Sequence, residues 1–182
     1  MIISIRGTSG SGKTHLARAV MDRLGPRQEI PQEGERQHVG YVCFGPPLLR
    51  VLGRYNVASG GADRISNREL AFRLLGEWAP SGHVLYEGLL IGNEVQRTIL
   101  LNRTNPTHVI FLDVPLDACL EAINARRASR GETEPVSLKK TTEKFEELKR
   151  VRFRLKDAGV KTYYLGREAA LDQVLNLLEM KR

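Results

Sequence analysis

The chain has few cysteines, few histidines and no long hydrophobic run. Its 182 residues include two cysteines and four histidines. Cys43 and Cys119 stand among apolar residues, so we expect two reduced core side chains rather than a disulfide or a nucleophile. The cysteines and histidines form no cluster with zinc-ligand spacing, and no apolar run is long enough to span a membrane. These absences argue against disulfide-stabilised secreted domains, zinc modules and integral membrane proteins.

The chain also lacks an internal repeat, a low-complexity tract and a clear second domain. With 182 residues, 41% of them hydrophobic and 27% charged, it is long enough for one well-packed α/β domain. We therefore expect a single domain over residues 1–182. Because the first expected strand begins at residue 1, we expect no targeting segment before it and a cytoplasmic protein.

Acidic residues are fewer than basic ones, and the formal net charge at pH 7 is +7. Residues 126–156 hold most of the excess, with eleven Lys and Arg against five Asp and Glu. Such a stretch is either a solvated basic helix face or a surface that attracts a polyanion. In the second case the partner would be a nucleotide or a nucleic acid backbone.

A glycine-rich loop follows the apolar residues 1–5. Its sequence, Gly7-Thr8-Ser9-Gly10-Ser11-Gly12-Lys13-Thr14, has the pattern G-x-x-x-x-G-K-[ST]. The glycines allow backbone N–H groups to surround phosphate oxygens, and the helix expected to begin near Lys13 adds the positive end of its dipole. Lys13 is expected at the β- and γ-phosphates, and the Thr14 hydroxyl on Mg²⁺. The loop predicts binding of a nucleoside triphosphate, with ATP as the default donor.

Strand-like and helix-like apolar periods alternate along the chain. We expect strands at residues 1–5, 38–44, 83–86, 107–114 and 160–165, with helices between and after them. Residues 27–37 are polar and predict an exposed connection, whereas Ser66-Asn67-Arg68-Glu69 has the pattern of a helix-capping box. This order predicts a three-layer α/β fold with a five-stranded parallel sheet and right-handed crossovers.

Ligands of such folds bind at the carboxyl ends of the strands, where two carboxylates are candidates for one role. Glu87, at the end of the third expected strand, could orient Mg²⁺ through water or accept the proton of the acceptor hydroxyl. Asp63, which follows Gly60-Gly61, is the alternative base or an anchor for that hydroxyl. The glycine pair would allow the backbone to approach a substrate closely.

The second half of the chain has an arginine-rich segment after a strand, a proline turn and a helix. The strand and turn are in Phe111-Leu112-Asp113-Val114-Pro115-Leu116-Asp117, and the arginines are in Arg126-Arg127-Ala128-Ser129-Arg130-Gly131. With the glycine-rich loop, this arrangement resembles the thymidylate kinase-like P-loop nucleoside and nucleotide kinases over nearly the whole chain. The resemblance implies an ATP- and Mg²⁺-dependent phosphotransferase with a helical lid at about residues 126–137.

Arginines in a lid have a direct physical role in phosphoryl transfer. A guanidinium that closes over the migrating phosphoryl group stabilises its charge, and closure of the lid excludes water. Arg126 and Arg130 are four residues apart, and we expect them on one helical face as the two catalytic candidates. Arg127 is expected to point elsewhere.

The acceptor is suggested by a second resemblance. Thymidylate kinases have an Asp-Arg-aromatic triplet after the third strand, where this chain has Tyr86-Glu87-Gly88. The segments 51–56 and 60–63 instead resemble phage P-loop kinases, including the 5-hydroxymethyluridine DNA kinases. This resemblance implies DNA as the acceptor, which fits the basic charge, and a flipped-out base. Tyr55 or Trp78 could stack on that base, although Trp78 also has the helical spacing of a core residue.

Two further functions remain as alternatives. One is a kinase of the same fold that acts on a free deoxynucleoside or its monophosphate. The other is a nucleotide-dependent switch that hydrolyses ATP slowly, which leaves the arginine-rich segment without a role. The sequence does not indicate an oligomeric state.

Overall fold

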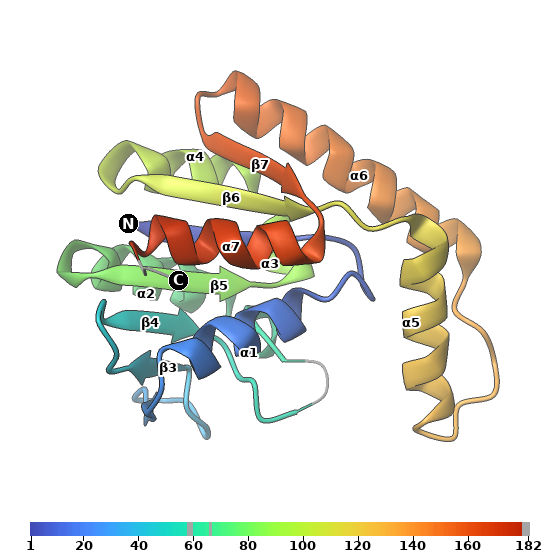
Figure 1. The fold of residues 1–182 in the computed structure, drawn as a ribbon, viewed down its shortest axis with the longest axis horizontal. Coiled ribbons are helices and arrows are strands. Elements are labelled where there is room, and N and C mark those ends of the chain that lie inside the picture. The colour runs from blue at the N-terminus through green and yellow to red at the C-terminus, as the bar shows by residue number, and fades with distance from the viewer. Residues whose placement is uncertain (58–59, 66, 180–182) are drawn as a thin grey trace.

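A mixed sheet of seven strands lies at the centre of the computed structural model, which describes residues 1–57, 60–65 and 67–179 (Figure 1). The strand order is β2-β3-β4-β5-β1-β6-β7. From β4 to β7 the strands are parallel, whereas β3 is antiparallel to both of its neighbours. The strands are β1 (Ile2–Arg6), β2 (Arg27–Ile30), β3 (Gly40–Cys43), β4 (Leu49–Leu52), β5 (His83–Glu87), β6 (Thr107–Leu112) and β7 (Lys161–Leu165).

The expectation of a five-stranded, all-parallel sheet is wrong at one edge. The strand expected at residues 38–44 is β3, but it forms a hairpin with β4, and β4 takes the place beside β5. The polar segment expected to be an exposed connection contains β2, whose side chains are mostly exposed. An edge strand is held by backbone pairing on one side, so a short polar one leaves no apolar period in the sequence.

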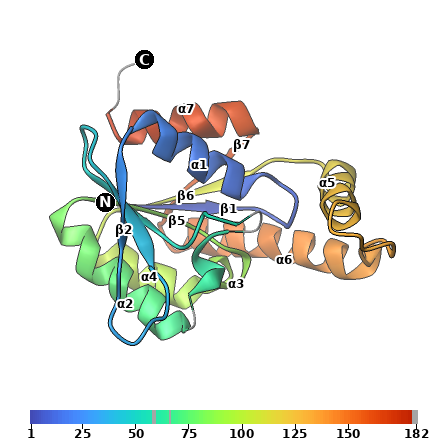
Figure 2. The ribbon, with the colours of Figure 1, turned by 90° about the horizontal axis from the view of Figure 1, so that it is seen from below.

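Helices cover both faces of the sheet, which gives three layers (Figures 1 and 2). Helices α1 and α7 pack on one face, and α2, α4 and α6 contribute the buried side chains on the other. Helix α5 stands beyond the carboxyl end of the sheet (Figure 1). The helices are α1 (Lys13–Arg23), α2 (Arg68–Trp78), α3 (Leu89–Gly92), α4 (Val95–Thr104), α5 (Leu116–Ala128), α6 (Leu138–Asp157) and α7 (Arg167–Leu177).

Strand β1 separates two halves of the core. Ile3 and Ile5 pack with α1 and α7, whereas Ile2 packs with α2. All five residues of β1 are buried, as expected of a strand with a neighbour on each side. No helix in the described ranges is long and apolar enough to cross a membrane.

The start of α2 matches part of the expected capping box. Asn67 is the N-cap, and its side-chain oxygen accepts a hydrogen bond of 2.8 Å from the backbone N–H of Glu69. Ser66, the first residue of that pattern, lies outside the described residues.

The sheet register brings two sequence-predicted segments to the same edge. Ile5 of β1 pairs with Glu87 of β5, so the loop after β1 and the carboxylate that ends β5 are neighbours. On the other side of β1, Arg6 pairs with Phe111 of β6. The candidate site therefore lies at the carboxyl ends of the central parallel strands.

Candidate active site

The loop between β1 and α1 has the tight curvature that its glycines predict. Gly10 and Gly12 have φ angles of 80° and 99°, in the region that favours glycine. A Cβ atom at Gly7 would lie 2.4 Å from Ser11 Oγ, so no larger residue fits there without a shift. Gly12 is also the N-cap of α1, and the positive end of that helix dipole therefore faces the loop.

The polar side chains of the loop are largely buried. Lys13 Nζ donates a hydrogen bond of 3.0 Å to the backbone oxygen of Thr8. Burial lowers the pKa of Lys13, and the charges of Glu87 and Asp63 oppose that shift. Among the described residues, the buried hydroxyls of Thr8 and Ser11 have no hydrogen-bond partner. Phosphate oxygens would supply acceptors for such otherwise costly groups.

Thr14 and Glu87 bring two oxygen atoms together beside Lys13. Thr14 Oγ1 donates to Glu87 Oε1 at 2.8 Å, and Glu87 is only 2% exposed. Burial raises the pKa of Glu87, while Lys13 and the hydrogen bond from Thr14 lower it. In the described part of the chain, no group of three or more His, Cys, Asp or Glu could hold a metal. A hydroxyl and one carboxylate nevertheless fit Mg²⁺, which commonly takes its other ligands from phosphate and water.

Asp63 is held by the start of α3. Its carboxylate accepts hydrogen bonds from the backbone N–H groups of Leu89, Leu90 and Ile91, at 2.6, 3.0 and 3.3 Å. A Cβ atom at Gly88 would lie 2.6 Å from Asp63 Oδ1, so glycine leaves the room that this carboxylate occupies. Asp63 thus orients the turn that follows Glu87, a role with no signal in the sequence because the partners are 26 to 28 residues away.

The glycines before Asp63 serve contacts within the protein. A Cβ atom at Gly61, where φ is 106°, would lie 2.5 Å from Glu87 Oε1. One at Gly60 would lie 2.3 Å from the backbone oxygen of Arg54. The close approach expected toward a substrate is therefore, in this structure, an approach to Glu87 and to the neighbouring backbone.

Two cavities have Asp63 in common. The first, of about 300 Å³, is lined by the glycine-rich loop and by Thr14, Glu87 and Arg126. The second, of about 700 Å³, is lined by residues of α2, α3 and α4. Lys13 also lines the first cavity, which therefore contains four of the five predicted catalytic residues. Arg130 is not one of the residues that line it.

The expectation that Arg126 and Arg130 share one helical face stays a prediction, because α5 ends between them. Arg126 lies in the last turn of α5, which ends at Ala128, and Arg130 lies in the turn that follows. Gly131 has a φ of 76°, and the N–H of Glu132 bonds to the oxygen of Arg127 at 3.0 Å. The left-handed Gly131 closes the turn that contains Arg130 and follows α5.

Arg127 points away from the cavity, as expected, and holds the segment after α5. Its Nε donates to the backbone oxygen of Glu134 at 2.9 Å, and its Nη1 lies 3.1 Å from Glu132 Oε2. Arg127 therefore ties the connection between α5 and α6 to the end of α5. We call residues 129–137 the α5–α6 connection.

The sequence did not indicate two arginines that hold the backbone around the site. Arg167 of α7 donates from Nε to the backbone oxygen of Ser11 at 2.9 Å, from 156 residues along the chain. Arg18 lines the smaller cavity and donates to the backbone oxygens of Tyr55 and Val57, at 2.8 and 2.5 Å. Arg18 follows Thr14 by one helical turn, which is the only signal that could have indicated it.

Tyr55 cannot stack on a bound base in this arrangement. It is 6% exposed and packs with the core, and its backbone N–H bonds to the hydroxyl of Tyr41 at 3.3 Å. Burial, together with the charge of Glu87, raises the pKa of Tyr55. Trp78 packs against the core cluster beside α2, in line with its helical spacing.

Comparison with known proteins points to one group of relatives. A 5-hmdU DNA kinase of Pseudomonas phage PaMx11 is 34% identical over 183 residues, which cover 98% of this chain and 97% of the relative. A 5-hmdU DNA kinase of Delftia phage PhiW-14 is 24% identical, over 97% of this chain and 72% of the relative. One of Pseudomonas phage M6 is 26% identical over 97% of both chains.

Two other comparisons add little. No family model matches the chain. A solved gluconokinase from Sinorhizobium meliloti 1021 aligns over 97% of this chain and 94% of its own, with a TM-score of 0.47 and 14% identity. That likeness is too distant to bear on fold or activity.

Proposed function

The chain belongs to the family of the phage 5-hmdU DNA kinases, and we propose that it transfers the γ-phosphoryl group of ATP to the hydroxyl of 5-hydroxymethyluracil in DNA. The bond between the γ-phosphorus and its bridging oxygen breaks, and a bond to the hydroxymethyl oxygen forms. ADP and a phosphate ester of the base are the products, and a carboxylate of the chain takes the hydroxyl proton. The convergence of Lys13, Glu87, Asp63 and Arg126 on one cavity carries the proposal.

The donor occupies the glycine-rich loop and a cavity next to it. The backbone N–H groups of the loop and the charge of Lys13 bind the phosphates in the smaller cavity, which we call the phosphate cavity. A further cavity of about 520 Å³, lined by Val114, Pro115, Gly166 and Arg167 among others, receives the nucleoside end. Arg167 connects the two regions because it also contacts the oxygens of Ser11 and Gly10.

Thr14 and Glu87 are the residues that would hold a magnesium ion. When bound there, Mg²⁺ neutralises and orients the phosphate oxygens of the donor. Glu87 is buried and already engaged by Thr14, which favours a role in orienting ligands over a role as the base.

Asp63 is the better candidate for the base. It lies where the two cavities meet, and its side chain is exposed. From the residues that the structure describes, Oδ2 accepts one hydrogen bond, that of Leu89, so a lone pair remains for the acceptor hydroxyl. The larger cavity, on the other side of Asp63, then holds the acceptor base.

Arg126 and the α5–α6 connection complete the site. Arg126 lines the phosphate cavity from α5, where its guanidinium stabilises charge on the migrating group. The connection acts as the lid, with Arg127 keeping it attached to α5. Arg130 is the second lid arginine, carried on the turn at its tip.

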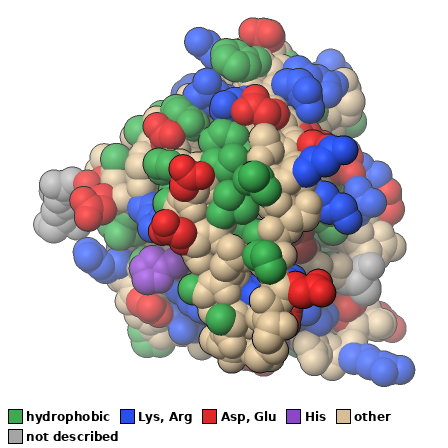
Figure 3. Space-filling view, turned by 90° about the vertical axis from the view of Figure 1, so that its right-hand side faces the viewer, with side chains coloured by type: hydrophobic (Ala, Val, Ile, Leu, Met, Phe, Trp, Pro, Cys, Tyr) green, Lys and Arg blue, Asp and Glu red, His purple; other side chains and the backbone are tan. Residues whose placement is uncertain are grey.

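Basic side chains near this site are suited to the DNA backbone. Figure 3 shows Lys and Arg side chains gathered along one side of the face where α5 lies. Helix α6 contributes exposed lysines at positions 139, 140, 144 and 149. Phosphate contacts of this kind position a protein on DNA without reading its sequence.

The test is transfer of label from γ-labelled ATP. Duplex DNA containing 5-hydroxymethyluracil, the same duplex with thymine, and a mixture of free deoxynucleoside monophosphates are offered in parallel. We expect label in the modified duplex alone. Label in a free nucleotide would overturn DNA as the acceptor, and slow ATP hydrolysis without transfer would overturn the kinase reaction.

A further inference from the structure

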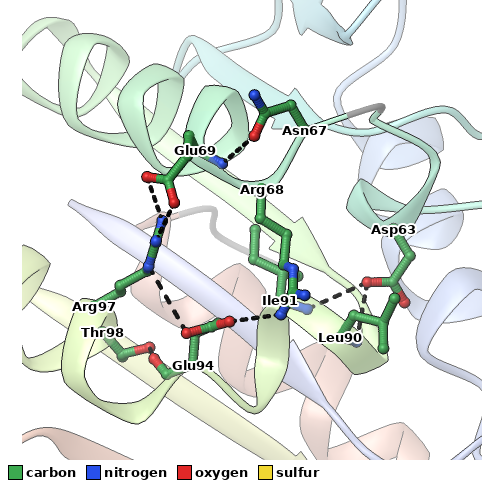
Figure 4. Close-up of polar contacts among 9 residues, drawn as sticks. All are labelled: Asp63, Asn67, Arg68, Glu69, Leu90, Ile91, Glu94, Arg97 and Thr98. Atoms are coloured by element: carbon green, nitrogen blue, oxygen red, sulfur yellow. Dashed lines mark hydrogen bonds and ion pairs between the residues drawn. The ribbon is translucent and has the colours of Figure 1, made fainter.

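Three charged side chains form a row in the larger cavity, beyond Asp63. Arg68 Nη1 lies 2.8 Å from Glu94 Oε1, and Arg97 Nε lies 3.8 Å from Glu94 Oε2. Figure 4 shows Glu94 between the two arginines, with Asp63 beyond Arg68. Arg97 is held from its other side by Glu69, through a hydrogen bond of 2.8 Å from Nη1 and a second, shorter one from Nη2.

The row offers hydrogen-bonding groups in the order donor, acceptor, donor. Each guanidinium has five N–H groups, and each carboxylate oxygen has two lone pairs. The ion pairs within the row therefore leave donors on Arg68 and Arg97 and lone pairs on Glu94. Four other members of the lining are apolar and buried, namely Ala62, Ile65, Ala71 and Ile91, whereas Asn67 is polar and Leu90 is exposed.

Structural stability gives little reason for this row. The side chains of Arg68, Glu94 and Arg97 are 60%, 29% and 33% exposed, and ion pairs that solvent reaches add little to stability. A cavity of about 700 Å³ beside the candidate base is, in contrast, large enough for a nucleotide.

We propose that Arg68, Glu94 and Arg97 read the Watson–Crick edge of the flipped acceptor base. This inference rests on the proposed function, since it names how the acceptor is recognised. Uracil presents O4, N3–H and O2 on that edge, in the order acceptor, donor, acceptor, which the row complements at every position. Cytosine presents an amino group where uracil has O4 and a bare N3 where uracil has N3–H. It therefore mismatches the first guanidinium and the carboxylate.

The shape of the base agrees with the position of Asp63. The C5 substituent of a pyrimidine lies across the ring from C2. When O2 of the base faces Arg97 and O4 faces Arg68, the hydroxymethyl group on C5 therefore points away from Arg97. Along the row that direction leads toward Asp63 (Figure 4), which also lines the smaller cavity. One orientation thus satisfies both the edge and the reacting hydroxyl.

The experiment compares two duplexes that carry the modified base opposite an abasic site, so that they differ only in the edge of that base. One contains 5-hydroxymethyluracil and the other 5-hydroxymethylcytosine, which has the same reacting group. We expect kcat/KM of the wild-type protein to favour the uracil duplex by on the order of 100-fold or more, because a site built for hydrogen bonds strongly rejects a mismatched analogue. Glu94→Gln presents an amide that can donate to a bare N3, and we expect it to reduce this ratio about tenfold.

Two further variants make the comparison specific. Arg68→Ala removes a mainly exposed side chain, and we expect it to lower activity on the uracil duplex more than on the cytosine duplex. Glu77→Gln is the matched control, since Glu77 pairs with Arg73 on α2 outside the cavity, and its ratio should equal that of the wild type.

The outcomes separate this inference from the proposed function. Edge reading would be overturned if Glu94→Gln and Arg68→Ala both kept the wild-type ratio of kcat/KM between the uracil and cytosine duplexes. It would also be overturned if the wild type were equally active on the two duplexes. Either result would leave DNA kinase activity in place. Transfer by the wild type to a free nucleotide and to neither duplex would instead refute the proposed function itself.

Discussion

The carboxylate of Asp63 has two tasks that substitutions can separate. It accepts hydrogen bonds from three backbone N–H groups at the start of α3, and it lines both cavities. Asparagine keeps one side-chain oxygen for the backbone but is no longer a proton acceptor of comparable strength, whereas alanine removes both functions.

We expect Asp63→Asn to reduce the rate of transfer by about 10²–10⁴-fold, the usual contribution of a general base, without weakening ATP binding. Single-turnover transfer and equilibrium binding of ATP measure the two quantities. Lys13→Ala is the comparison, because loss of the loop lysine should abolish transfer and also weaken ATP binding. Near-normal transfer by Asp63→Asn would show that Asp63 is not the base.

The backbone task of Asp63 has its own readout. We expect Asp63→Ala to lower the free energy of unfolding by about 1 kcal/mol relative to Asp63→Asn, as for the loss of a helix cap. Urea denaturation of the two variants measures this difference. Equal stabilities would mean that the hydrogen bonds with Leu89, Leu90 and Ile91 do not stabilise the turn.

At the scale of elements, α5 and the α5–α6 connection determine where the arginines lie. The helix ends at Ala128, so Arg126 remains beside the glycine-rich loop while Arg130 is carried on the following turn. Arg127 joins that turn to the backbone of Glu134. Of these neighbouring arginines, Arg126 therefore lines the phosphate cavity, whereas Arg127 holds the α5–α6 connection in place.

This arrangement predicts unequal effects of the two neighbouring arginines. Arg126→Ala should lower kcat by about 10²–10³-fold, the range seen when a donor to the transition-state charge is removed. Arg126→Lys should recover only part of that loss, because an ammonium lacks the planar pair of donors. Arg127→Ala should have a smaller effect on single-turnover rates. Equal losses for both alanine variants would argue that Arg126 acts only by holding the connection.

At the scale of the whole molecule, the positive charge is unevenly distributed. Residues 126–156 carry a large share of the net +7, and the lysines of α6 in this stretch are exposed. Because a protein releases counterions when it neutralises phosphates, the apparent affinity for duplex acceptor should fall steeply with salt. Each phosphate that the protein neutralises adds about −0.9 to the slope of log affinity against log salt concentration.

We expect the double variant Lys140→Ala, Lys144→Ala to make that slope shallower by about 2 units, because two phosphates of the duplex are no longer neutralised. Arg23→Ala is the control, since Arg23 is exposed at the end of α1, away from α6 (Figure 1). Binding of labelled duplex at several salt concentrations gives the slopes. An unchanged slope in the double variant would remove this part of α6 from the DNA-binding surface.

Features that depend on neighbouring residues were determined by the sequence itself. The glycine-rich pattern is eight consecutive residues, six of them between β1 and α1 and two at the start of α1, so glycine conformations and the helix start shape it locally. Buried strands such as β1 and β6 are mostly apolar, and they end where the candidate site lies. Glu87 could be identified for the same reason, as a carboxylate that directly ends such a strand.

Contacts between distant segments were decided only by the tertiary structure. The hairpin of β3 and β4, the buried position of Tyr55 and the bond from Arg167 to the loop depend on strand order and packing. The apolar spacing typical of a strand or a helix does not predict such contacts, because it indicates only which face of its own element a residue occupies. The row of Arg68, Glu94 and Arg97 arises in the same way, from two helices that the sheet brings to one cavity beside Asp63.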